Sequence, residues 1–175
     1  MAPDDPKGAA AIARRIKHPW YRCQALAYAA ECSRDAERAR LLQESVQAAQ
    51  AQDEPNRVVT VAGWPVRVLA ETSPAQAADL IRQLVGIAET EPHHLRRANA
   101  LQALAFSVAN RPELLKLIVP ALAAALLSGS GWRIGRIIRH TFELVRATHP
   151  ELLRSLALHH KANRQQQRLL ASIPA

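Results

Sequence analysis

Several basic residues near the C-terminal end of the chain share one side of a segment with helical periodicity. They are Arg133, Arg136, Arg139, His140 and Arg146, and they lie opposite Ile134, Ile137, Ile138, Thr141 and Val145. Guanidinium groups bind carboxylates and phosphates through paired N–H donors. Only Glu143 interrupts this basic side, and like charges three or four residues apart on a helix repel each other slightly. The segment is therefore the candidate binding site for an anionic partner.

The positive charge of the chain is concentrated in its second half. Residues 1–92 contain 11 lysines and arginines against 12 aspartates and glutamates, a net charge of −1. Residues 93–175 contain 12 against 3, a net charge of +9, and six of the seven histidines. Such an asymmetry favours an anionic partner at this end. The tail either extends the basic surface or is a polar cap on the last helices; its basic residues are Arg154, His159, His160, Lys161, Arg164 and Arg168.

Other site chemistry is not supported by the sequence. Cys23 and Cys32 are nine residues apart on one expected helix, or roughly 13 Å, whereas a disulfide needs Cα atoms within about 7 Å. We expect free thiols that serve as small buried side chains. The adjacent His159 and His160 point about 100° apart on a helix and cannot hold one ion from one face. We find no zinc spacing, phosphate-binding glycine loop or Ser/His/Asp arrangement, and we predict no enzyme activity, metal or cofactor.

The composition indicates an all-α protein. Alanine, leucine, arginine, glutamine and glutamate are abundant, only 4% of residues are aromatic, and there are 6 glycines. No apolar run approaches the roughly 18–20 residues that span a bilayer. The acidic, proline-containing first residues differ from a secretory signal, so we expect a cytoplasmic protein.

Two independent features repeat along the chain at a similar interval. Arg22, Arg57, Arg97 and Arg133 are separated by 35, 40 and 36 residues. Helix-start patterns at Ser73, Asn110 and Thr148 each combine an N-cap residue, a proline and a Gln or Glu three residues later, and Ser33 begins a weaker version. These intervals predict stacked helical hairpins. We expect the recurring arginines to contact carboxylates or carbonyls of neighbouring repeats, the alternative being a functional ladder along one face.

The repeats predict one domain over residues 1–175. Its parts are an N-terminal helix at 8–17, helix pairs at about 19–51, 55–90, 92–128 and 131–162, and a C-terminal cap at 163–171. Pro65 and Pro120 fall inside two of the expected helices. Each should kink or break its helix, because proline lacks a backbone donor and clashes with the preceding turn.

The chain resembles HEAT/armadillo repeats. Residues 16–26, Ile-Lys-His-Pro-Trp-Tyr-Arg-Cys-Gln-Ala-Leu, are similar to bacterial α-helical repeats of the form I-x-x-P-x-x-R-x-x-A-L, and residues 91–101 follow the pattern loosely. The resemblance covers about residues 8–163. It implies an α-solenoid, a right-handed superhelix of about four hairpins that acts as a binding scaffold. A tetratricopeptide array is second, because its repeats are shorter and its Leu-Gly and Tyr spacing is missing.

Tryptophans stand near the starts of expected first helices, at Trp20, Trp64 and Trp132. We expect them to fill gaps between repeats. The alternative is a DNA-repair glycosylase of the helical-repeat type, which uses tryptophans beside a catalytic acid on a basic concave surface. Asp79 is the only aspartate on a central expected helix, and no catalytic residue can be transferred from that class.

The resulting hypothesis is a non-catalytic scaffold that binds an acidic protein or peptide through the basic residues of segment 131–147. The alternative is a nucleic-acid-binding repeat protein that contacts phosphates, with or without a link to DNA repair, and a regulatory module of a larger complex also stays open. Changing Arg133, Arg136 and Arg139 to Glu should abolish partner binding and leave thermal stability nearly intact.

Overall fold

The computed structural model describes residues 5–174, and within them every regular element is a helix. The prediction of an all-α protein is therefore confirmed. In chain order the elements are α1 (Pro6–Arg15), α2 (Pro19–Glu31), α3 (Asp35–Gln50), α4 (Pro55–Thr72), α5 (Pro74–Glu89), α6 (His94–Ser107), α7 (Pro112–Leu115), α8 (Val119–Ser128), α9 (Trp132–Thr148), the 3-10 helix η1 (Pro150–Leu152), α10 (Leu153–His159) and α11 (Asn163–Ala171).

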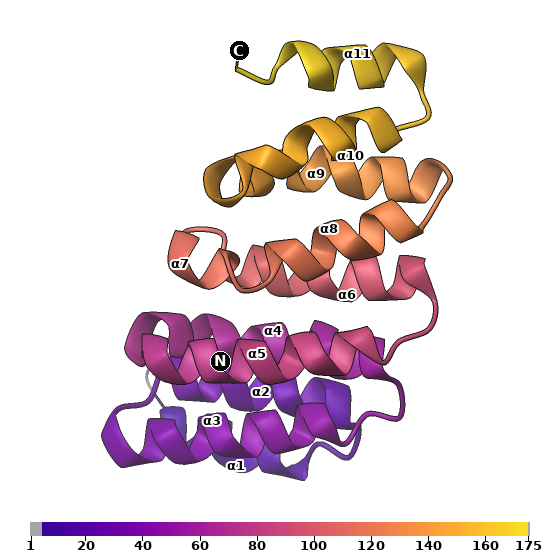
Figure 1. Cartoon of the computed structure of the whole chain (residues 1–175). Coiled ribbons are helices and arrows are strands. Elements are labelled where there is room, and N and C mark those ends of the chain that lie inside the picture. Colours follow the sequence, from indigo (N-terminus) through magenta and orange to yellow (C-terminus); the bar gives the residue numbers. More distant parts are fainter. Residues whose placement is uncertain (1–4, 175) are drawn as a thin grey trace.

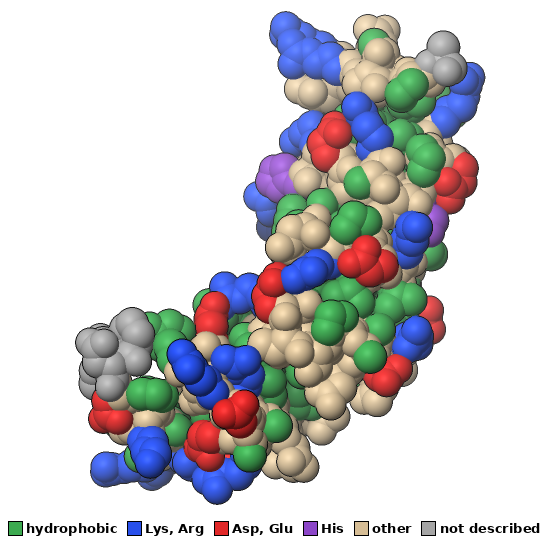
Figure 2. Space-filling model, turned by 90° about the vertical axis from the view of Figure 1, so that its left-hand side faces the viewer, with side chains coloured by type: hydrophobic (Ala, Val, Ile, Leu, Met, Phe, Trp, Pro, Cys, Tyr) green, Lys and Arg blue, Asp and Glu red, His purple; other side chains and the backbone are tan. Residues whose placement is uncertain are grey.

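The helices stack in an elongated body with two layers (Figure 1). The first layer contains α2, α4, α6 and α9, and each of these helices packs against the next. The second layer contains α3, α5, α7 with α8, and α10, which run back across the first. Figure 2, which looks onto the helix ends, shows that the stack is bent rather than straight.

Buried apolar side chains form one continuous cluster from Ala10 to Ala157. Many of them are alanines, which allow neighbouring helices to approach closely. The apolar side expected for residues 131–147 is buried as predicted, including Ile134, Ile137, Ile138 and Val145. Burial of this side directs the basic residues of α9 outward.

Prolines rather than capping boxes mark the helix starts. Pro74, Pro112 and Pro150 each open an element, as the sequence predicts. The Ser73 side chain makes no capping hydrogen bond, however, and the other two N-caps are Arg111 and His149. Both lie one residue after the expected cap, because proline forces the residue before it into an extended conformation. The capping-box interpretation is therefore wrong.

The expected N-terminal helix at 8–17 also begins earlier than predicted. Asp5 is its N-cap, and its carboxylate accepts a hydrogen bond of 2.8 Å from the Gly8 backbone N–H. Pro6 is the first helical residue, and the extended Ile16 ends the helix. An acidic residue near the start of the chain thus caps α1.

The two internal prolines act differently. Pro120 lies in the first turn of α8, and the expected second helix of the third pair is broken before it into α7 and α8. α4, in contrast, continues through Pro65 without a break. The carbonyl that Pro65 deprives of its helical donor belongs to Val61, and it accepts a hydrogen bond from Cys23 in α2 instead.

Candidate functional site

The basic residues of α9 are placed by a glycine turn. Gly131 has a φ of 97°, a conformation that a side chain would strain, and it is the N-cap of α9. At Gly129 a Cβ atom would lie 2.8 Å from Ile134 Cδ1. The turn therefore puts Trp132 and Arg133 in the first turn of α9, where Trp132 is 69% exposed.

Arg133 and Arg136 both lie against the ring of Trp132. Their guanidinium carbons are 5.4 Å and 5.5 Å from its centroid, within the range of cation–π attraction. Among residues 5–174 neither arginine takes part in an ion pair or a side-chain hydrogen bond. The indole thus holds two exposed guanidinium groups whose N–H donors can still bind a carboxylate.

Arg139 instead contacts the interior. Its Nη1 lies 2.8 Å from Nε2 of His160, whose side chain is buried and whose Nδ1 accepts a hydrogen bond from the Ala162 backbone. The ring fits because residue 135 is glycine, where a Cβ would lie 2.9 Å from Nε2. Burial, reinforced by the Arg139 charge, lowers the pKa of His160. Arg139 is therefore also a structural residue, which revises the expectation that three arginines could be reversed without loss of stability.

Arg146 is held by intramolecular contacts as well. It donates a hydrogen bond of 3.0 Å to Ser172, pairs with Glu143 at 3.4 Å and lies over the ring of Phe142. These contacts connect α9 to the end of α11. His140 is exposed. Of the five predicted residues, the structure leaves Arg133, Arg136 and His140 available, and together with Trp132 we call them the α9 basic surface.

Trp132 was missed as a site residue, although the sequence contains a signal for it. At 100° per residue it falls within the arc that Arg133, Arg136 and Arg139 occupy, opposite the buried isoleucines. Its position on the exposed side of an amphipathic helix means that packing against the core does not account for it.

Several arginines of the first three helix pairs are paired with carboxylates. Arg14 pairs with Glu44 at 2.7 Å, Arg67 with Glu31 at 3.0 Å and Arg96 with Glu54 at 3.1 Å, and Arg111 pairs with Glu71. The last three pairs connect successive helix pairs. Figure 2 shows basic and acidic side chains next to each other over this part of the stack. Arg133 and Arg136 have no such carboxylate among the described residues, and they differ from Arg22, which has none either, in lying against the exposed ring of Trp132.

The recurring arginines follow the prediction only in part. Arg97 contacts the Glu89 carbonyl of the preceding pair at 3.5 Å, as expected. Arg57 pairs with Glu54 at the start of its own helix, at 2.8 Å. No side-chain hydrogen bond or ion pair of Arg22 occurs among the described residues.

A second exposed feature is a groove of about 350 Å³ on the first layer, which we call the aromatic groove. It is lined by Trp20, Thr60, Gly63, Trp64, Arg67, Ala103, Phe106 and Ser107. With its side-chain oxygen turned toward the indoles, Gln24 accepts hydrogen bonds of 3.1 Å from Nε1 of both Trp20 and Trp64. Trp64 is 38% exposed and so fills a gap between repeats only in part, whereas Trp132, at 69% exposed, does not do so as predicted.

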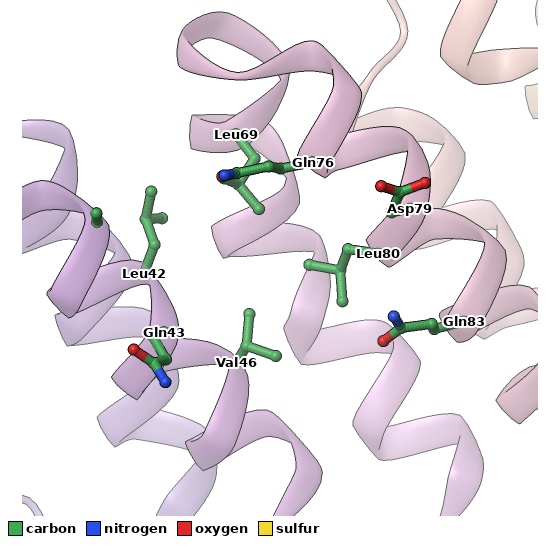
Figure 3. A pocket seen from close by; sticks show the side chains of 9 residues that line it. Leu42, Gln43, Val46, Leu69, Gln76, Asp79, Leu80 and Gln83 are labelled. Atoms are coloured by element: carbon green, nitrogen blue, oxygen red, sulfur yellow. The ribbon is translucent and has the colours of Figure 1, made fainter.

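A larger groove, of about 440 Å³, separates α3 from α5 on the second layer. In Figure 3, Val46 and Leu80 point into it, with Gln43 and Gln83 at its sides. Asp79 is on its rim and pairs with Arg82 at 2.7 Å. Asp79 is thus in the second layer and the tryptophans are in the first, so the acid-and-tryptophan arrangement of helical-repeat glycosylases is not formed by these residues.

The thiols and histidines form no further site in the described part of the chain. Cys23 and Cys32 are free thiols, and burial raises the pKa of Cys23 to about 11, which keeps it protonated and unreactive. No three His, Cys, Asp or Glu side chains between residues 5 and 174 are grouped to hold a metal ion. None of the described helices combines the length and apolar character needed to traverse a bilayer.

Comparison with known proteins returned no match to a family model, to a curated protein or to a solved structure.

Proposed function

We propose that this chain is a non-catalytic interaction protein that binds an acidic segment of a partner protein through the α9 basic surface. One observation carries the proposal: Arg133 and Arg136 lie against the exposed Trp132 without a carboxylate partner among the described residues. Tryptophan and arginine contribute most often to the binding energy of protein interfaces. Two guanidinium groups already held in place lose less side-chain entropy when they bind carboxylates.

The distribution of the remaining basic residues favours a short acidic segment over duplex DNA. Lys116 and Arg154 belong to the second layer, so the basic residues of the second half do not converge on one face. Duplex DNA is held mainly by many phosphate contacts made at once. Nucleic-acid binding remains the alternative function, because phosphates would also satisfy Arg133 and Arg136.

The proposed scaffold is a HEAT/armadillo-like α-solenoid, a right-handed superhelix of about four hairpins. Its support is the spacing of salt-bridge partners: Glu31 and Arg67, Glu54 and Arg96, and Glu71 and Arg111 are 36, 42 and 40 residues apart. The intervals of 42 and 40 residues agree with the repeat length of about 40–47 residues in that class, and the first interval is shorter. In a solenoid each pair contacts only its neighbours, which leaves an extended surface for partners.

A salt titration tests the proposed partner. Binding of a fluorescently labelled peptide of about 12 glutamates and of a duplex DNA of about 20 base pairs would be measured by anisotropy from 50 to 500 mM NaCl. We expect saturable binding of the peptide, and DNA binding that is weaker and is displaced by the peptide. DNA binding with a log–log salt slope of several units, together with no binding of the peptide, would replace the proposal by the nucleic-acid alternative.

A further inference from the structure

The aromatic groove and the α9 basic surface lie on the same layer of the fold. The groove lies over α2, α4 and α6, and α6 also packs against α9. We propose that the groove takes an apolar side chain of the same acidic partner segment, so that the segment carries an aromatic or large aliphatic residue beside its carboxylates. This inference rests on the proposed function and names the chemistry of its partner.

The indoles of the groove are fixed with their polar edges already satisfied. Gln24 accepts from both Trp20 and Trp64, and the Arg67 guanidinium carbon lies 5.1 Å from the centroid of Trp64. Buried indole N–H groups need a partner, and here the partner is internal. What remains exposed is ring surface, together with the side chain of Phe106, which is 47% exposed. This surface of aromatic rings favours binding of apolar side chains of a partner over side chains that need a hydrogen bond.

Small residues keep the groove open. Gly63 and Ala103 are part of its lining. A Cβ atom at residue 63 would meet Ser107 Cβ at 3.5 Å, which is ordinary van der Waals contact, so the packing there does not require glycine. Glycine inside a helix costs about 0.5–1 kcal/mol relative to alanine. Packing alone therefore does not account for Gly63, but a groove that must stay open for a ligand does.

The charges near the groove favour a protein side chain over a nucleotide base. Arg67 on its rim is paired with Glu31, and Arg96 and Arg111 elsewhere on the layer are paired with Glu54 and Glu71. A bound nucleotide would bring a phosphate to a nearly neutral region. An apolar side chain requires no counter-charge there, and the acidic part of the segment reaches the arginines of α9.

The separation of the two features suits a short extended segment. In Figure 1, α6 and α9 run in the same direction across the stack. Packed helix axes lie roughly 8–10 Å apart, and an extended chain covers about 3.4 Å per residue. The groove residues of α6 lie near its C-terminal end and Arg133 and Arg136 near the start of α9, which adds an offset of roughly 12 Å along the helices. About seven residues of extended chain therefore reach from the aromatic groove across α6 to the α9 basic surface.

The test uses the full chain and four labelled peptides of about 12 residues. One contains only glutamates, and the others carry a single phenylalanine at the first, middle or last position. We expect at least one phenylalanine peptide to bind about tenfold more tightly than the glutamate peptide, as burial of one aromatic ring implies. Trp64→Ala and Phe106→Ala should each remove this gain without weakening the glutamate peptide. Tyr28→Ala, an exposed aromatic residue of α2 outside the groove lining, is the matched control and should keep the gain.

The outcomes separate this inference from the proposed function. If the glutamate peptide binds but phenylalanine adds nothing, or if Trp64→Ala and Phe106→Ala keep the gain, the groove is not part of the site. If no peptide binds, both proposals are wrong. A thymidine oligonucleotide of about 12 nucleotides is measured in parallel. If it binds more tightly than every peptide and loses that binding in Trp64→Ala, the groove stacks bases instead.

Discussion

The thiol of Cys23 in α2 lies 3.5 Å from the backbone carbonyl of Val61 in α4, the acceptor that Pro65 leaves without its helical N–H. The Ser45 hydroxyl donates to the Cys23 carbonyl at 2.8 Å and its oxygen lies 3.4 Å from the thiol, so the Val61 carbonyl and the Ser45 oxygen share the thiol hydrogen. This contact explains how α4 stays continuous through Pro65, and with it the placement of Trp64 between α2 and α6.

Removing this donor should destabilise the protein. Cys23→Ala leaves the Val61 carbonyl buried without a partner, and we expect a loss of about 1–3 kcal/mol in the free energy of unfolding. Cys23→Ser keeps a donor and should lose much less. Urea unfolding followed by circular dichroism measures both. If the two variants are equally destabilised, the volume of the side chain matters rather than its hydrogen bond.

The two thiols should also differ in reactivity. Burial raises the pKa of Cys23 to about 11, whereas Cys32 is partly exposed at the end of α2. At pH 8 a thiol reagent should modify Cys32 in the native protein and reach Cys23 only after unfolding. Mass spectrometry of the labelled peptides checks this, and rapid labelling of Cys23 in the folded chain would contradict the described packing of α2.

His160 should make stability depend on pH. Its pKa is lowered by burial and by Arg139, so below the usual histidine pKa of about 6.5 the unfolded chain binds a proton that the folded chain resists. The free energy of unfolding should fall between pH 7.5 and 5.5, above the range in which carboxylates such as Glu44 titrate. His160→Gln should reduce this fall and the exposed His140→Gln should not. An equal fall in all three proteins would exclude His160 as its source.

The arginines of α9 should separate by their effect on stability. Arg133 and Arg136 lie against the exposed Trp132 and make no ion pair or side-chain hydrogen bond among the described residues. Arg133→Glu and Arg136→Glu should therefore leave the thermal midpoint within about 2 °C. Arg139→Glu replaces the group that faces Nε2 of the buried His160 and should shift the midpoint by more. Thermal scans of the three single variants decide this, and a large drop for Arg133→Glu or Arg136→Glu would mean that these residues are structural.

Local sequence rules could predict where the helices lie but not which basic residues remain exposed. Pro74, Pro112 and Pro150 mark helix starts through their own covalent geometry, which needs no tertiary information. Arg133 and Arg139 are both basic residues on one side of the same helix. They differ because His160, 21 residues after Arg139, returns to contact it. Only the packing of α9 against the end of α10 reveals that difference.

The aromatic groove could not be predicted from the sequence for a similar reason. Trp20 and Trp64 are far apart in the sequence, and their shared acceptor Gln24 brings them together across α2 and α4. Periodicity identifies which residues of one helix face outward, but it does not show which helices are neighbours. The unusual combination of Gly63, Trp64 and Pro65 inside an expected helix was the local signal.

The most direct test of the account compares two charge reversals of equal size. The first double variant carries Arg133→Glu and Arg136→Glu, and the control carries Lys116→Glu and Arg154→Glu. Each double variant lowers the net charge of the basic half by four. The control residues, however, are exposed in the second layer. Anisotropy with the labelled glutamate peptide should show at least a tenfold loss of affinity for the first double variant and less than about twofold for the second. Equal losses in both variants would show that net charge alone attracts the peptide and would contradict a site on α9.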